Sequence, residues 1–295
     1  MNGAQKVIKY CAMAFGIFLA ITIIGAIVSA IAGAFGAFSF FKNVKIHHSS
    51  SDNYSVESTN EDGVRSYVFD GIEDIRIEGG VYKLVVKEGP ELKVVMDNVS
   101  DDYGAKQSGD ELVIYSEEDT WFFNIHFNMD KEDTKGTIYL YLPDDFKANK
   151  FDLTIGVGTV QLSDLRADTI DIECGVGNLT VENIIGEKVD IQGGVGQLKF
   201  KDVNFSDADI EGGVGSIDFS GKLSGKSVVS SGMGSVELSI EGEKDDYEIE
   251  VESGLGAIHI DGEKCGDVHL DSSSSKHKLE VDGGVGSINI DFSED

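Results

Sequence analysis

The chain has 295 residues, and its 53 acidic and 24 basic side chains give a formal net charge of −29 at pH 7. A surface this acidic repels nucleic acid and anionic lipid headgroups, so we exclude nucleic-acid binding. Three cysteines are too few for a disulfide framework, and this composition tolerates an oxidising exterior without requiring one.

The N-terminal region predicts a membrane anchor. Residues 11–41 form a run of 31 residues without a charged side chain, and about 20 apolar residues suffice to cross a bilayer. We expect a short cytoplasmic tail at 1–10, a transmembrane helix at 11–41 and a flexible polar linker at 42–63. The chain would then be a single-pass protein of the cell membrane, with its N-terminus cytoplasmic and its C-terminal part extracytoplasmic.

Two alternatives for this segment stay open. Ala30-Ile31-Ala32 has the form of a signal-peptide cleavage site, but the apolar run is longer than the core of a signal peptide and continues past that site. Gly25, Ser29, Gly33 and Ala37 fall four residues apart. Such a stripe of small side chains lets two membrane helices approach closely, so the segment could form a homo-oligomer.

Residues 64–150 predict an irregular β-rich cap or lead-in to the C-terminal half of the chain. Residues 92–96, 112–115 and 137–142 have the composition of strands. The end units of a repeat array are atypical because they shield the open end of its core. An aromatic cluster at 121–127 includes Trp121 and Phe122. It is either a strand packed on the core or an exposed platform for a protein or glycan partner.

Residues 151–295 contain seven copies of Gly-x-Gly, each between segments in which apolar and polar side chains alternate with period two. The first five copies start 19 residues apart, and the next two steps are 22 and 30. A fixed period predicts an all-β fold, a β-solenoid whose repeats stack in parallel on their neighbours. The repeat glycines are Gly156, Gly158, Gly175, Gly177, Gly194, Gly196, Gly213, Gly215, Gly232, Gly234, Gly254, Gly256, Gly284 and Gly286.

Three apolar columns recur in these repeats. They are the residue between the glycines and the residues two and four positions after the second glycine, which in the third copy are Val195, Leu198 and Phe200. We expect the three columns to stack into one continuous apolar core. The glycines would lie at the corners, where a Cβ would clash with a neighbouring repeat.

Ligand-binding interpretations of the glycines fit less well. A calcium β-roll needs a ligand where this chain has Leu198 and Ile217, and a dinucleotide-binding motif needs a third glycine that opens a helix. The chain has no His-Glu-x-x-His, Gly-x-Ser-x-Gly or Cys-x-x-Cys motif. We therefore expect no catalytic residue, no cofactor and no enzyme, and a wall-active hydrolase is the least favoured alternative.

Acidic side chains recur at two neighbouring outward positions of the repeats. Asp171, Asp190 and Asp209 occupy one, and Glu173 and Glu211 occupy the other. Stacked about 4.8 Å apart, they would form ladders of like charge, which destabilise a sheet unless they are screened or bridged. We expect a solvated face that keeps the protein soluble, weak bridging by divalent cations, or docking of a cationic peptide or partner.

Residues 138–143 have the pattern apolar-x-apolar-x-Leu-Pro and introduce the Gly-x-Gly repeats. In this the chain resembles the putative-adhesin family of bacterial surface β-repeat proteins, over roughly residues 64–292. The resemblance implies an extracytoplasmic β-solenoid, often membrane-anchored, and brings no catalytic residues. The expected role is adhesin-like binding or scaffolding at the bacterial envelope. The alternative is an accessory protein of an envelope-stress signalling system that senses cationic peptides.

Overall fold

The computed structural model describes residues 63–116, 136–270 and 275–293, all within the unit Asp52–Asp295. These residues form 21 strands and one turn of 3-10 helix, η2 (Lys244–Asp246). The described residues contain no other regular element, so the all-β fold class is confirmed. Pairing links the strands into one sheet, which is open rather than closed. No helix in this part of the chain is long and apolar enough to cross a membrane. The expected transmembrane helix at 11–41 and the linker up to residue 62 lie outside the described residues.

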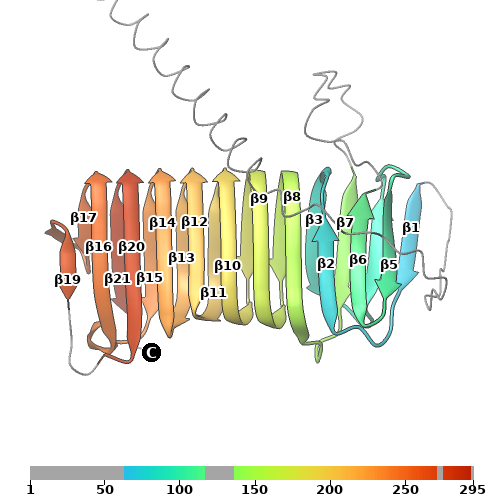
Figure 1. The fold of residues 1–295 in the computed structure, drawn as a ribbon, viewed down its shortest axis with the longest axis horizontal. Coiled ribbons are helices and arrows are strands. Elements are labelled where there is room, and N and C mark those ends of the chain that lie inside the picture. Colours follow the sequence, from blue (N-terminus) through green and yellow to red (C-terminus); the bar gives the residue numbers. More distant parts are fainter. Residues whose placement is uncertain (1–62, 117–135, 271–274, 294–295) are drawn as a thin grey trace, which may run out of the picture. The chain divides into compact units, whose positions relative to one another are not determined.

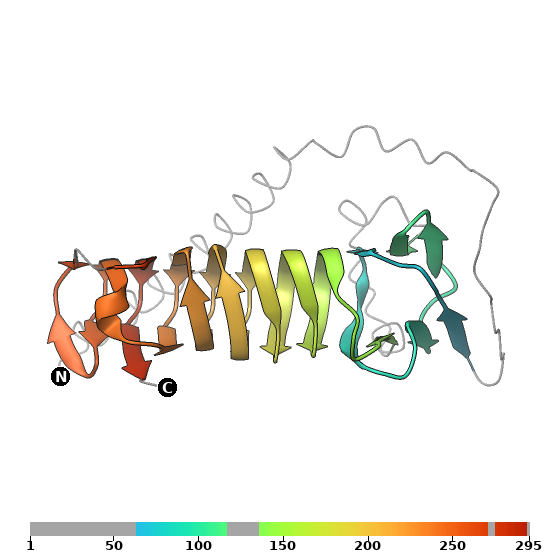
Figure 2. The ribbon, with the colours of Figure 1, turned by 90° about the horizontal axis from the view of Figure 1, so that it is seen from below.

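The regular repeats stack in parallel and in register. The strands are β8 (Ala148–Ser163), β9 (Arg166–Glu182), β10 (Ile185–Val195), β11 (Leu198–Ser206), β12 (Ala208–Val214), β13 (Ile217–Ser224), β14 (Lys226–Met233) and β15 (Val236–Glu241). Each repeat, which we call a rung, pairs with the equivalent residues of the next, as Ile172 does with Ile191 and Ile191 with Ile210. Figure 1 shows these strands side by side, and Figure 2 shows the rungs from below, turning from one face to the other.

Two of the three expected apolar columns form the core. The column of Leu198 and the column of Phe200 are buried in every rung, and no member exceeds 5% exposure. In the middle of the stack the rings of Phe200, Phe205 and Phe219 pack with centroids 5.8–6.3 Å apart. Period-two alternation therefore predicted these columns correctly, because a strand places every second side chain on one face.

The third expected column, the residue between the glycines, is not in the core. Val195 is 37% exposed and Leu255 is 71% exposed, so the expectation of burial was wrong. The interior of the corner is already filled, because a Cβ built on Gly193 would lie 2.8 Å from Cδ2 of Leu198. The chain turns at the glycines, and the central side chain points outward from the bend.

The last two repeats do not stack in chain order. The C-terminal rung, β20 (His277–Val285) and β21 (Ile288–Ser293), lies between β14–β15 and the rung formed by β16 (Tyr247–Leu255) and β17 (Ile258–Ile260). Val285 accordingly pairs with both Met233 and Leu255. Figure 1 shows β20 between β14 and β16. The expected stacking of each repeat on its chain neighbours holds for the first five repeats and for the contact between the last two. It is wrong between the fifth and the sixth repeat, because the seventh lies between them.

Antiparallel strands complete both ends of the stack. Before β8 come a rung of β2 (Asp74–Glu78) with β3 (Val81–Glu88) and a rung of β6 (Glu111–Ser116) with β7 (Thr137–Leu142). At that end β4 (Lys93–Asp97), β1 (Val64–Val68) and β5 (Tyr103–Ser108) pair antiparallel. At the other end β18 (Glu263–Cys265) covers β17, and β19 (Val268–Leu270) covers β16.

Candidate functional site

The backbone amides at the glycine corners form hydrogen bonds to the corner of the neighbouring rung. At Gly196, Gly215, Gly234 and Gly286 the N–H of the second glycine donates to the carbonyl of the central residue in the next rung. The N–O distances are 2.9 Å for Gly196 to Val214, 2.8 Å for Gly215 to Met233 and 2.8 Å for Gly234 to Val285. A Gly-rich loop that binds phosphate needs free N–H groups. These amides already have acceptors, so they are not a phosphate site.

Two constraints explain why the corners are glycine. At Gly177, Gly196, Gly215, Gly234 and Gly286 φ lies between +141° and +151°, where residues with a Cβ rarely occur. A Cβ built on Gly196 would also overlap the carbonyl oxygen of Gly177 in the preceding rung. The first glycines are tight for the same reason, since a Cβ on Gly194 would overlap the carbonyl oxygen of Gly175.

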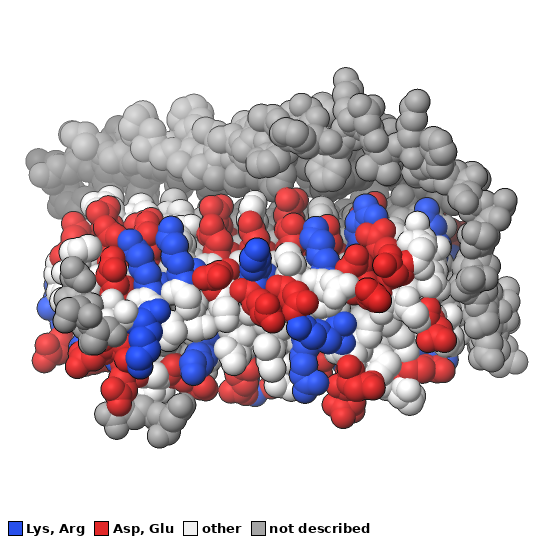
Figure 3. Space-filling model, turned by 60° about the horizontal axis from the view of Figure 1, so that its bottom comes forward, with Lys and Arg blue, Asp and Glu red and all other residues white. Residues whose placement is uncertain are grey.

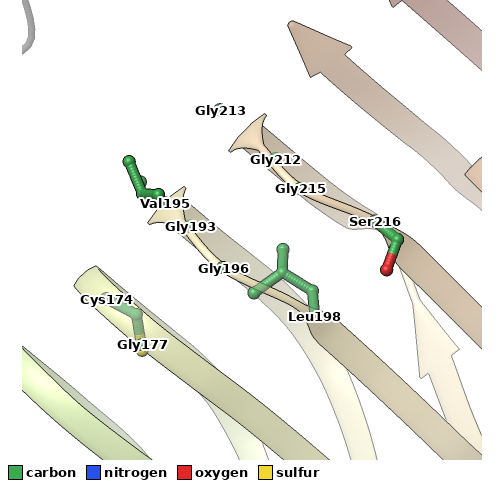
Figure 4. Close-up of a pocket in the computed structure, with 11 residues that line it drawn as sticks. Cys174, Gly177, Gly193, Val195, Gly196, Leu198, Gly212, Gly213, Gly215 and Ser216 are labelled. Atoms are coloured by element: carbon green, nitrogen blue, oxygen red, sulfur yellow. The ribbon is translucent and has the colours of Figure 1, made fainter. Parts of the chain in front are cut away.

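A small hollow lies along the glycine rows. Its volume is about 10 Å³, and it is lined by glycines of three rungs together with Cys174, Val195, Leu198 and Ser216. That is room for about one water molecule. Figure 4 shows Val195 at the corner with its side chain directed away from Leu198. The hollow is too small for a nucleotide or a phosphate.

A second depression lies near the N-terminal end of the described stack. Its apolar lining includes Phe69, Ile72, Leu92 and Phe146. Its charged lining consists of three acidic side chains and one lysine. It is wide and open to solvent, so it does not enclose a ligand in the way that small-molecule sites do.

The acidic residues picked out in the sequence line up on one face, and Asp152 extends their row by one rung. Asp152, Asp171, Asp190 and Asp209 are direct neighbours in successive rungs. Two residues further along the strands, Glu173 and Glu211 form a second column with Gln192 between them. We call Asp152, Asp171, Glu173, Asp190, Asp209 and Glu211 the acidic ladder. Figure 3 shows acidic side chains along the whole row of rungs, with lysines and arginines interspersed.

Basic side chains neutralise the two ends of this face more than its middle. Nζ of Lys150 lies 2.8 Å from Oδ2 of Asp152 and 3.7 Å from Oδ2 of Asp171. At the other end of the face Lys278 lies 3.1–3.7 Å from three glutamates. Among the described residues, no ion pair involves Glu173, Asp190, Asp209 or Glu211.

Burial and mutual repulsion raise the pKa values of three carboxyl groups in the acidic ladder. Burial raises the pKa of Asp171, and the charges of Asp152 and Asp190 raise it further. The pKa of Glu173 and that of Asp209 are raised by burial first and then by neighbouring aspartates. The ionised ladder is therefore destabilising at neutral pH, and a cation placed on it would relieve the repulsion.

Other candidate side chains do not form a site among the described residues. Trp121 and Phe122 lie outside the described residues. Nδ1 of His259 lies 3.1 Å from Oδ1 of Asn289, which accounts for that ring nitrogen. Cys174 and Cys265 are free thiols, and burial raises the pKa of Cys174 to about 12. In the three described ranges, no group of three or more histidines, cysteines and acids is placed to hold a metal ion.

Sequence reasoning missed an exposed apolar column at the corners. It consists of the central residues of the Gly-x-Gly copies, which we call the corner ridge; in stack order they are Val157, Val176, Val195, Val214, Met233, Val285 and Leu255. One signal was present in the sequence. A residue flanked by two glycines has no neighbouring Cβ to cover it, so it stays uncovered when the chain bends there.

Comparisons with known proteins gave one family match and several similar solved structures. A model of the family described as Toastrack DUF4097 matches residues 72–283. The structure of a putative cell adhesion protein from Clostridium sporogenes ATCC 15579 is similar, with 17% identity, a TM-score of 0.39, and coverage of 78% of this chain and 99% of that one. The structure of a putative adhesin from Bacteroides fragilis NCTC 9343 is also similar, with 15% identity, a TM-score of 0.42, and coverage of 77% of this chain and 95% of that one. No curated protein matches the chain.

Proposed function

Since this chain belongs to the Toastrack DUF4097 family, we propose that it is a membrane-anchored β-solenoid scaffold outside the cytoplasm of a bacterium, which binds a protein or glycan at the envelope in an adhesin-like way. The family match confirms the resemblance seen at residues 138–143 and in the glycine repeats. Residues 11–41, which carry no charge, would supply the anchor.

The observation that carries this proposal is the regularity of the surface. Each rung repeats the same outward positions, so the faces carry continuous columns of one chemical type, such as the acidic ladder and the corner ridge. Neither of the two hollows described above encloses a group of titratable side chains of the kind found in enzyme sites. Extended uniform faces suit a partner that makes many equivalent contacts.

Topology is tested with single cysteines in a variant that lacks Cys11, Cys174 and Cys265. A membrane-impermeant maleimide should label Lys199→Cys, which is exposed on β11, in intact cells. It should label Asn2→Cys only after lysis. Labelling of Asn2→Cys but not Lys199→Cys in intact cells would overturn the proposed orientation, and a chain recovered entirely in the soluble fraction would overturn the anchor.

Adhesin-like binding is tested with cells that express the whole chain. Such cells should adhere to purified cell-wall glycan or to partner cells more strongly than cells without it. Adhesion that is the same with and without the chain on every surface would contradict the proposed role.

A second candidate function follows from the middle of the acidic ladder, where the described residues form no ion pair. Burial raises the pKa of Asp209 and the charge of Asp190 raises it further, and Lys226 offsets this repulsion only in part. A cationic peptide would relieve it, which suits a sensor in an envelope-stress system. Calorimetric titration with an oligolysine should show binding that weakens with salt and with Asp190→Asn. Glu241→Gln, an exposed change away from the ladder, is the control. Equal weakening by both variants would contradict this function.

A further inference from the structure

We propose that the corner ridge is a docking surface for a second copy of this chain. The ridge is continuous, because each of its residues pairs in register with the next, from Val157 to Leu255. Six of its seven side chains are between 37% and 71% exposed, and Val214 is half-buried. A single exposed valine needs no explanation, but a row of aliphatic side chains along one edge marks a contact surface.

The edge around the ridge carries no charge. In each rung the window from the residue before the first glycine to the residue after the second, such as 193–197, is free of Asp, Glu, Lys and Arg. This holds in all seven rungs, although charged residues make up 26% of the chain. Two copies that each carry −29 repel one another. An uncharged edge lets them come into contact without burying a carboxylate.

The spacing of the edge is self-complementary. The side chains of the ridge stand out between two rows of glycines, which carry no side chains that would hold a second copy away, and only a water-sized hollow lies beside Val195. A second ridge has the same spacing between rungs, about 4.8 Å, so its side chains can meet those of the first copy rung by rung. Repeated identical side chains in register form dry interdigitated contacts of this kind.

The area available suggests a weak dimer. Seven rungs at about 4.8 Å and five residues at about 3.3 Å give a strip of roughly 34 by 16 Å, so a pair buries at most about 1,100 Å². This only just exceeds the roughly 1,000 Å² that specific interfaces need. Long-range charge repulsion opposes an apolar contact, so dimerisation should strengthen as sodium chloride is raised.

Cross-linking of the full-length chain in detergent tests the proposal. In the variant without native cysteines, Val195→Cys is compared with Ile185→Cys, a residue of β10 that is 44% exposed and lies outside the ridge. With a bismaleimide that reaches roughly two rungs, about 10 Å, Val195→Cys should give at least about fivefold more dimer. Equal cross-linking at both positions would overturn the proposal.

Sedimentation equilibrium of the same full-length chain separates the ridge from the other routes to association. Val195→Asp with Val214→Asp should weaken the dimer at least about tenfold, because it places carboxylates in an apolar contact. Val195→Thr, which keeps the shape, should weaken it less and serves if the charged variant is unstable. Gly33→Leu should leave the ridge dimer unchanged.

Three results would overturn the proposal. The first is a dimer that survives both aspartates and is lost in Gly33→Leu, which assigns association to residues 11–41. The second is a chain that stays monomeric at every salt concentration. The third is a chain that stays monomeric in neutral phosphatidylcholine vesicles and whose Val195→Cys is protected there from a membrane-impermeant maleimide, which assigns the ridge to lipid. None of these results depends on the envelope role or its ligand.

Discussion

At the scale of single residues, the second glycine of each corner meets a backbone and a steric requirement at once. Gly196 has φ of +150°, and the carbonyl oxygen of Gly177 occupies the place where its Cβ would be. Its N–H also donates to the carbonyl of Val214 on the other side. A side chain here would therefore disturb the preceding rung directly and the following rung through this hydrogen bond.

Replacement of a corner glycine should be severely destabilising. We expect Gly196→Ala to lower the free energy of unfolding by about 3 kcal/mol or more, because strained φ adds to a backbone clash. Gly266→Ala is the matched control, since Gly266 has open space around its Cβ position and no positive φ. It should stay within about 0.5 kcal/mol of the parent chain. Urea unfolding measures both, and similar values would contradict the role of the corner.

In the acidic ladder, by contrast, replacing a surface residue should stabilise the protein. Asp190 raises the pKa of Asp171 and Asp209, and no ion pair of the described residues offsets its charge. Asp190→Asn should stabilise the protein by about 0.2–1 kcal/mol, because it removes like-charge contacts within the column. Chemical denaturation at low salt measures the gain, which should shrink as salt is added. A loss of stability at low salt would contradict it.

The pH dependence follows from the same shifts. The ordinary pKa is 3.8 for aspartate and 4.5 for glutamate, and folding raises it for Asp171, Glu173, Asp209 and Asp282. Between the unfolded and folded values the folded chain binds more protons, so these groups make stability fall as pH rises through that window. The gain from Asp190→Asn should therefore be larger at about pH 7 than at about pH 4.5. Thermal unfolding of both chains measures this, and a larger gain at the lower pH would contradict it.

At the scale of single elements, the stability of each strand depends on the apolar contacts of its buried side chains inside the stack. Phe205 on β11 is fully buried, with ring centroids 6.2 Å from Phe200 and 6.3 Å from Phe219. We expect Phe205→Ala to destabilise the protein by about 3–5 kcal/mol, because the stacked rungs cannot collapse into the cavity. Phe205→Leu, which leaves a smaller cavity, should be less than half as damaging. Equal effects in urea unfolding would contradict this packing.

Local pattern predicted the strands and two core columns because both depend on neighbours within a few residues. It failed at Val195, where the direction of the side chain depends on where the bend lies and on Leu198 already filling the corner. The acidic columns were also predicted, since equal spacing and parallel stacking bring Asp171 beside Asp190. The sequence did not predict that basic side chains neutralise these columns unequally, because Lys150 reaches Asp152 and Asp171 from a different column.

At the scale of the whole stack of described strands, the order of rungs could not be deduced from the repeats alone. Every rung presents the same columns, so β16 could pair equally well with β14 or with β20 as far as its own residues show. The longer steps of 22 and 30 residues marked the place where the order changes. Between β17 and β20 the chain forms β18 and β19, which pair antiparallel on the terminal rung. These short strands cover an edge that would otherwise be open to pairing with another chain.

The inserted C-terminal rung makes a prediction about which residues can be joined. Ser230 pairs with Asp282, and Asp282 pairs with Glu252, so Ser230 and Glu252 lie two rungs apart. In the variant without native cysteines, Ser230→Cys with Asp282→Cys should form a disulfide, since neighbouring strands bring their Cα atoms within bridging range. Closing this loop should raise the free energy of unfolding by roughly 2–4 kcal/mol. Ser230→Cys with Glu252→Cys is the matched pair that should stay reduced. Stacking in chain order would reverse the outcome, because β16 would then lie directly against β14.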